Sequence, residues 1–154
     1  MVFMKTETSR REALALAGIA GLAALLAPRM SFADAAMVDA EIKKLYGDKK
    51  FDSGKIKLDV PEIAENGLVV PITVDVESPM TDADYVKAVH VFADGNPLPG
   101  IVSYKFTPAC GKASASTRMR LAQTQNIICI AEMSDGKLYS TKSSVKVTIG
   151  GCGG

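Results

Sequence analysis

The chain has 154 residues, of which 47% are hydrophobic and 23% are charged, and its formal net charge is +1. The length indicates one domain, and the apolar content excludes a disordered chain. A net charge close to zero gives no basic surface for a nucleic-acid backbone, so we expect no nucleic-acid partner.

Residues 1–33 have the organisation of an export signal. Arg10 and Arg11 precede an uncharged run over residues 13–27, and small residues at Ser31 and Ala33 suit cleavage by a signal peptidase. A membrane-spanning helix needs roughly 20 apolar residues, so this run is too short and we expect no membrane anchor.

The adjacent arginines resemble those of a twin-arginine signal, although Ala13 stands where such signals usually have a large apolar residue. An ordinary secretory signal with two basic residues is the alternative. Cleavage after Ala33 would release the rest of the chain into the periplasm, an oxidising compartment in which disulfides are allowed.

Residues 36–46 are expected to form a short helix, because Val38, Ile42 and Leu45 (or Tyr46) recur at helical spacing. Asp34 is placed to cap its start, and Gly47 is placed to end it. The apolar stripe would pack on the domain itself or on a partner subunit.

From residue 55 onward, apolar residues alternate with polar ones, which predicts β-strands. Pro71 suggests a sheet edge or a bulge, and Asp135-Gly136 indicates a hairpin. The predicted strands cover residues 55–60, 68–76, 86–93, 101–106, 115–122, 126–133 and 137–149. A series of about seven consecutive strands predicts an all-β fold, an antiparallel β-sandwich, over residues 34–149.

The last predicted strand runs into Gly150-Gly151-Cys152-Gly153-Gly154. Since glycine has the widest backbone freedom of any residue, we expect residues 150–154 to form a mobile arm. Fully extended, the step from Ile149 to Cys152 spans roughly 10 Å. The thiol would therefore enter a narrow channel of another protein, and that protein would have to activate it, because the arm contains no base or cation.

Four segments together resemble the SoxY family, the sulfur-carrier subunits of periplasmic thiosulfate-oxidising (Sox) systems. They are the ending Lys-Val-Thr-Ile-Gly-Gly-Cys-Gly-Gly and residues 91–97, 118–123 and 131–136. The resemblance implies that the sandwich is immunoglobulin-like. It also implies that Cys152 is the site of covalent sulfur attachment, and that the flanking glycines form a swinging arm: Gly150, Gly151, Gly153 and Gly154.

The same resemblance implies the partners of the chain. They are a SoxZ-type subunit, which would form a heterodimer and be exported jointly, and three enzymes that dock transiently. A c-type cytochrome complex would couple thiosulfate to the thiol, a manganese-dependent hydrolase would remove sulfate, and a sulfane dehydrogenase, where present, would oxidise the remaining sulfur. The chain itself would not be an enzyme, and it would hold no cofactor beyond the sulfur on Cys152.

The chain contains two further cysteines, Cys110 and Cys129. Pairing them in a disulfide would leave Cys152 as the free thiol. The alternative is one exposed loop cysteine and one buried apolar cysteine, both unpaired. A hairpin centred near Thr124 would place Cys129 opposite Met119, which counts against the pairing.

Metal and nucleophile chemistry have little support in the sequence. His90 is the single histidine, and no Cys-x-x-Cys pair or other ligand pair stands at a useful spacing, so we expect no metal site. A histidine in a predicted strand is by default a polar residue on the strand face. Its pairing with a cysteine for catalysis lacks an orienting group.

Two other functions compete with that of a sulfur carrier. A secreted structural β-sandwich would use Cys152 for an intermolecular disulfide. A small redox enzyme would need a second thiol, and the arm has none.

Overall fold

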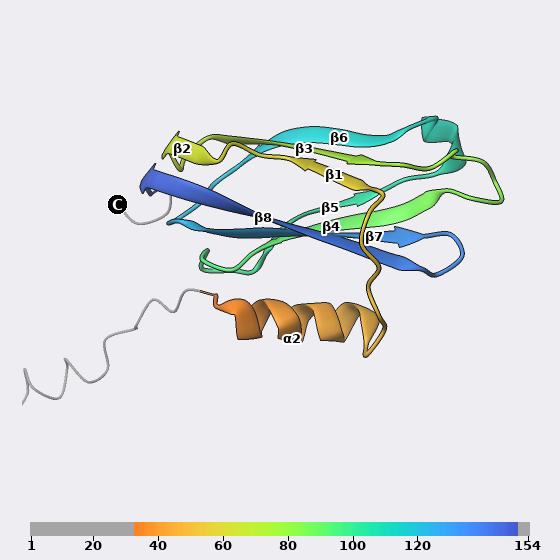
Figure 1. Cartoon of the computed structure of the whole chain (residues 1–154), viewed down its shortest axis with the longest axis horizontal. Coiled ribbons are helices and arrows are strands. Elements are labelled where there is room, and N and C mark those ends of the chain that lie inside the picture. The colour runs from red at the N-terminus through yellow and green to blue at the C-terminus, as the bar shows by residue number, and fades with distance from the viewer. Residues whose placement is uncertain (1–32, 151–154) are drawn as a thin grey trace, which may run out of the picture. The chain divides into compact units, whose positions relative to one another are not determined.

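The computed structural model describes residues 33–150, which belong to one compact unit of the chain, Ser31–Gly154. This part of the chain contains one α-helix, one short 3-10 turn and eight strands (Figure 1). In order they are α2 (Ala35–Tyr46), β1 (Ile56–Asp59), β2 (Ile63–Asn66), β3 (Val70–Val76), β4 (Val86–Ala93), β5 (Gly100–Lys105), the 3-10 turn η1 (Pro108–Cys110), β6 (Ala113–Met119), β7 (Gln125–Met133) and β8 (Leu138–Ile149). Over residues 33–150 no helix has the length and hydropathy to cross a membrane.

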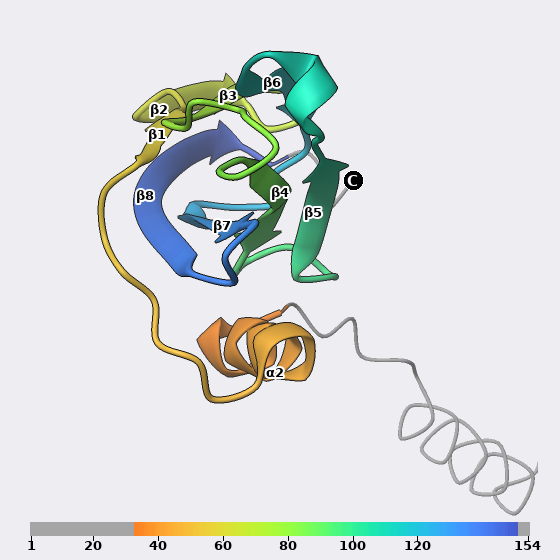
Figure 2. The ribbon, with the colours of Figure 1, turned by 90° about the vertical axis from the view of Figure 1, so that its right-hand side faces the viewer.

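The strands form two sheets that face each other. One sheet has the strand order β1-β3-β6, and the other has the order β2-β8-β7-β4-β5 (Figure 2). All pairs are antiparallel except β2 with β8, which are parallel. The fold is therefore a β-sandwich, as the strand pattern predicts, and it is immunoglobulin-like, as the family resemblance implies.

Alternation along β3 shows why these residues form a sandwich. Its apolar residues Val70, Ile72, Val74 and Val76 are buried, whereas the intervening residues face outward. They pack against inward-facing residues of β4, β7 and β8. Full burial of such a side chain contributes roughly 1.5–3 kcal/mol, so period-two alternation on two facing sheets is enough to build the core.

Contrary to what the sequence suggests, Pro71 lies neither in an edge strand nor at a bulge, but at a point of the middle strand where one neighbouring strand has ended. β3 is the middle strand of its sheet, but β1 ends with Asp59 opposite Thr73. At Pro71 only β6 lies beside β3, through Arg118. The missing amide proton of proline is tolerated because β3 has one partner strand there.

Helix α2 covers the outer face of the five-stranded sheet (Figures 1 and 2). Asp34 caps the helix, with Oδ1 accepting a hydrogen bond from the Met37 amide at 2.9 Å, and Gly47 ends it at a φ of 67°. Val38 and Tyr46 are buried against three sheet residues, Phe92, Ile130 and Leu138. The predicted stripe is therefore formed with Tyr46, and Leu45 is exposed.

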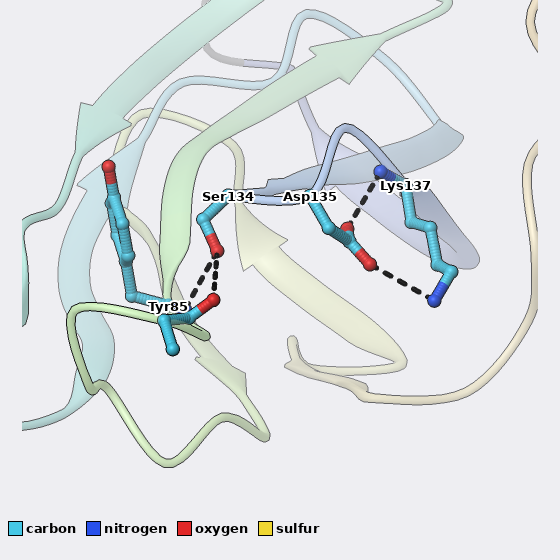
Figure 3. A network of polar contacts seen from close by, with 5 residues as sticks. Tyr85, Ser134, Asp135 and Lys137 are labelled. Atoms are coloured by element: carbon cyan, nitrogen blue, oxygen red, sulfur yellow. Dashed lines mark hydrogen bonds and ion pairs between the residues drawn. The ribbon is translucent and has the colours of Figure 1, made fainter.

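The predicted hairpin between β7 and β8 is confirmed (Figure 3). Asp135 accepts a hydrogen bond from the Lys137 amide at 3.0 Å and pairs with the Lys137 ammonium group, and these contacts lower the pKa of the Asp135 carboxyl group. Next to the turn, Ser134 exchanges hydrogen bonds with the backbone of Tyr85, just before β4. The turn that joins β7 to β8 is thus also tied to the neighbouring strand.

Two parts of the predicted strand pattern are wrong. Strand β2 was not predicted, and Leu68, expected inside a buried strand, is exposed because β3 begins only at Val70. The sequence pattern predicts one strand over residues 115–122, but β6 ends at Met119, and the chain then crosses to the other sheet before β7 begins. β6 and β7 therefore do not form a hairpin.

Replacing the helix cap should weaken the fold measurably. We expect Asp34→Ala to lower the free energy of unfolding by about 1 kcal/mol, because the Met37 amide loses its acceptor. Urea denaturation followed by circular dichroism measures this change. Asp39→Ala, which removes an exposed carboxylate from the same helix, should have a smaller effect. Equal losses in the two variants would contradict a capping role.

Candidate functional site

The predicted arm leaves the sandwich at the end of β8, and this end is held on one side by β2. Asn66 lies opposite Ile149 in the parallel β2–β8 pair. The Gly67 amide donates to the Ile149 carbonyl oxygen at 2.7 Å. Regular hydrogen bonding thus continues to the residue before Gly150, so the base of the arm has a fixed position on the sheet.

The connection between β6 and β7 holds the same end from the other side. The Thr124 hydroxyl accepts a hydrogen bond from the Val147 amide at 3.0 Å, and the Leu121 amide donates to the Gly67 carbonyl at 2.8 Å. Gly150 lies so close to Ala122 that a Cβ atom at this position would overlap with the Ala122 carbonyl oxygen. Glycine is therefore required at position 150 by the close approach of two backbone segments.

A polar network fixes the β6–β7 connection in turn. Asn96, in the turn between β4 and β5, accepts a hydrogen bond from the Ala122 amide and donates one to the Arg120 carbonyl oxygen, at 2.9 and 2.8 Å. The buried Gln125 side chain donates to Asn96 Oδ1 and accepts from the Gly95 amide. Since buried amide groups with satisfied hydrogen bonds have one favoured arrangement, the network makes this end of the sandwich rigid.

Of the predicted arm residues, only Gly150 lies among the described residues. Gly151, Cys152, Gly153 and Gly154 lie outside them, and so do Arg10 and Arg11 of the predicted export signal. The roles proposed for these residues stay predictions. Sequence reasoning explained Gly150 only by backbone freedom and missed its contact with Ala122, since no local pattern indicates contacts between distant segments.

Cys110 and Cys129 are both free, so the disulfide considered from the sequence is not formed in the structure. Cys129 lies in the middle of β7, opposite Val91 and Thr141, and is buried in the core between the sheets. Cys110 lies at the surface in η1. A core position and a surface turn do not bring the two sulfur atoms together.

Burial also determines the chemistry of Cys129. It raises the pKa of this thiol to about 12, because the apolar core disfavours the thiolate. The thiolate is the reactive form of cysteine in sulfur transfer. Cys129 is therefore a core residue whose thiolate form is disfavoured.

His90 lies on the outer face of the five-stranded sheet, beneath α2. Its Nδ1 atom is 2.8 Å from the Ser103 hydroxyl oxygen, and its ring lies edge-on to Tyr46 and stacks on Phe92. Burial lowers the pKa of its imidazole. Among residues 33–150, no three His, Cys, Asp or Glu side chains are grouped to hold a metal ion.

A family model for the sulfur oxidation protein SoxY matches residues 42–152. The chain belongs to the SoxY family. The match begins within α2, includes all eight strands of the β-sandwich and ends at Cys152, the residue that the sequence predicts as the attachment site. A solved structure of the sulfur carrier protein SoxY from Chlorobium limicola f thiosulfatophilum is 33% identical, with a TM-score of 0.63, over 75% of this chain and 100% of that chain.

Other solved structures share only the fold with this chain. A superoxide reductase (neelaredoxin) from Ignicoccus hospitalis is 16% identical, with a TM-score of 0.55, over 61% of this chain and 80% of that one. A putative superoxide reductase from Thermotoga maritima is 20% identical, also with a TM-score of 0.55, over 63% and 93%. A search of curated protein sequences found no significant match.

The two described thiols should differ sharply in reactivity. A pKa near 12 leaves roughly one Cys129 thiol in ten thousand ionised at pH 8. Alkylation of the native protein at pH 8, followed by peptide mass spectrometry, should therefore modify Cys110 and leave Cys129 intact. Both should react in guanidinium chloride. Equal reactivity in the native protein would contradict the buried position of Cys129.

The close approach at Gly150 can be tested by adding a methyl group. We expect Gly150→Ala to displace the end of β8 and to speed hydrogen exchange at the Gly67 amide by about tenfold, because this amide donates to Ile149. Gly100→Ala is the matched control, since a Cβ atom there meets open space. An unchanged exchange rate in Gly150→Ala would show that the contact with Ala122 is unimportant.

Proposed function

We propose that this chain carries sulfur covalently on Cys152 during thiosulfate oxidation and presents it to partner enzymes. The observation that carries the proposal is that the SoxY family match extends through the arm to Cys152. The related Chlorobium protein is itself a sulfur carrier. Burial disfavours Cys129 as the carrier thiol, whereas Cys110 is exposed, so the choice of Cys152 over Cys110 rests on the family match.

The chemistry of attachment requires an oxidant. The Cys152 thiolate and the outer sulfur of thiosulfate form a sulfur–sulfur bond, and two electrons leave to a c-type cytochrome partner. The product is a thiolate-derived adduct that ends in a sulfonate group. In a hydrolase, water then cleaves the bond to the sulfonate sulfur, which releases sulfate and two protons and leaves a persulfide anion on Cys152. Both steps take place in partner sites, and the chain itself supplies the thiol.

The rigid end of the sandwich suits this role. Strand β2, the β6–β7 connection and Asn96 hold the end of β8 in place, while Cys152 follows two residues beyond Gly150. Fully extended, these two residues span about 7 Å. A fixed base with a short glycine-rich extension keeps the thiol within this distance of a defined place on the sandwich, and the small glycines suit entry into a narrow channel.

The remaining parts of the proposal concern location and partners. The chain is exported to the periplasm by a twin-arginine signal over residues 1–33, forms a heterodimer with a SoxZ-type subunit, and holds no cofactor other than the sulfur on Cys152. It docks transiently to the cytochrome complex, the manganese-dependent hydrolase and, where present, the sulfane dehydrogenase. Its membership of the SoxY family supports these expectations.

Mass spectrometry of the protein from thiosulfate-grown cells tests the carrier function. We expect a mass increase that a reductant removes, located on the peptide that contains Cys152. Cys152→Ser should abolish it and leave the unfolding temperature unchanged, whereas Cys110→Ser, the matched control, should retain it. Adducts on Cys110 or Cys129 alone would overturn the proposal. Stoichiometric disulfide-linked homodimers through Cys152 would instead favour the structural alternative.

A further inference from the structure

The bond at which the export signal is predicted to be removed lies at the start of the folded domain. It joins Ala33 to Asp34, and both residues belong to the described part of the chain. Ala33 is only 3% exposed, and its amide donates a hydrogen bond to the Asn96 carbonyl oxygen at 2.7 Å. The residue before the bond is therefore held on the turn between β4 and β5.

The residue after the bond is held as well. Asp34 Oδ1 accepts a hydrogen bond from the Met37 amide at 2.9 Å, and the Asp34 carbonyl oxygen accepts from the Met37 and Val38 amides, both at 3.1 Å. Helix α2 begins one residue after Asp34. Both sides of the bond between residues 33 and 34 thus take part in the fold, one through a tertiary contact and the other through the helix cap.

A signal peptidase needs a different conformation at this place. It binds several residues around the bond that it cuts as an extended strand, and a buried, hydrogen-bonded segment resists such binding. Freeing residues 34–37 breaks the cap and unwinds the first turn of α2. This draws Val38, which is 1% exposed, out of the apolar cluster that joins α2 to the sheet. Cleavage therefore competes with the packing of the helix.

We propose that the folded precursor keeps the bond between residues 33 and 34 closed to the signal peptidase, so that the signal is removed only when this junction opens locally. Water is then added across the bond: the carboxyl group of Ala33 leaves with the signal, and the α-amino group of Asp34 stays on the carrier. The inference rests on the proposed export and adds to it the step that limits maturation. Because a twin-arginine signal carries folded cargo, the bond reaches the peptidase in its closed form.

The rate at which a purified bacterial signal peptidase cuts the full-length precursor tests this inference. A synthetic peptide of residues 20–40 contains the same bond without the fold. We expect the folded precursor to be cut at least about tenfold more slowly than the peptide, because cleavage of a transiently opened segment follows the population of the open form. The mass of the product identifies the bond that is cut.

A change in the helix contact should alter this rate without altering the residues around the bond. Val38→Ala should speed cleavage of the folded precursor about tenfold, because it weakens the packing of α2 on the sheet. The same substitution should leave cleavage of the peptide unchanged. Met37→Ala, the matched control, replaces an exposed side chain of the same turn and should change neither rate. Thermal unfolding shows whether each precursor is folded, and Ile130→Val, on the sheet side of the contact, replaces Val38→Ala if that variant does not fold.

The outcomes separate the two proposals. Equal rates for the folded wild-type precursor and the peptide would overturn the closed junction alone. An unchanged rate in a folded precursor with the weakened helix contact would also overturn it, since cleavage would then not require α2 to open. If neither the peptide nor the precursor were cut between residues 33 and 34, the proposed signal boundary would be overturned, and the closed junction with it.

Discussion

The pairing of β7 with β8 is the interaction on which the rest of the structure depends. It runs from Gln125 opposite Val145 to Glu132 opposite Leu138, in the middle of the larger sheet. One face of β7 supplies the sandwich core, and the other face supplies Ile130 to the contact with α2. β8 also pairs with β2 and leads into Gly150. Register in this one pair therefore sets the core, the helix contact and the place where the arm begins.

Burial makes the Cys129 thiol different in reactivity from an exposed cysteine of the same chain. Cys129 lies on the inward face of β7, where the apolar environment keeps its sulfur protonated. A protonated thiol in the core packs like a small apolar side chain and does not compete for sulfur. The fold thus disfavours Cys129 as a competing acceptor for the cargo proposed for Cys152, and it leaves Cys110 as the exposed thiol among residues 33–150.

The sequence predicts those features of the structure that depend on neighbouring residues, and it misses those that depend on contacts between distant segments. Capping by Asp34, the helix end at Gly47 and the alternation along β3 are local, and each was predicted. Strand β2 is only four residues long and pairs in parallel with a strand about eighty residues later, so its hydrogen bonds have no local signature. The consecutive apolar residues Leu68, Val69 and Val70 break period-two alternation, which is a local sign that the buried strand begins later than Leu68, and both Leu68 and Val69 lie outside it. The contact of Gly150 with Ala122 depends on the assembled sheets, so composition suggested only backbone freedom there.

Asn96 also joins the start of the folded domain to the base of the arm. Its backbone carbonyl oxygen accepts a hydrogen bond from the Ala33 amide at 2.7 Å, while its side chain bonds to Arg120 and Ala122. Ala33 itself is buried. An affinity tag or fusion partner attached at Ala33 would lie close to the β6–β7 connection, because Asn96 contacts both. It would therefore obstruct the binding of a partner enzyme near the base of the arm. Probes for binding studies are better attached at the turn between β7 and β8, because this turn lies at the opposite end of β8 from the arm.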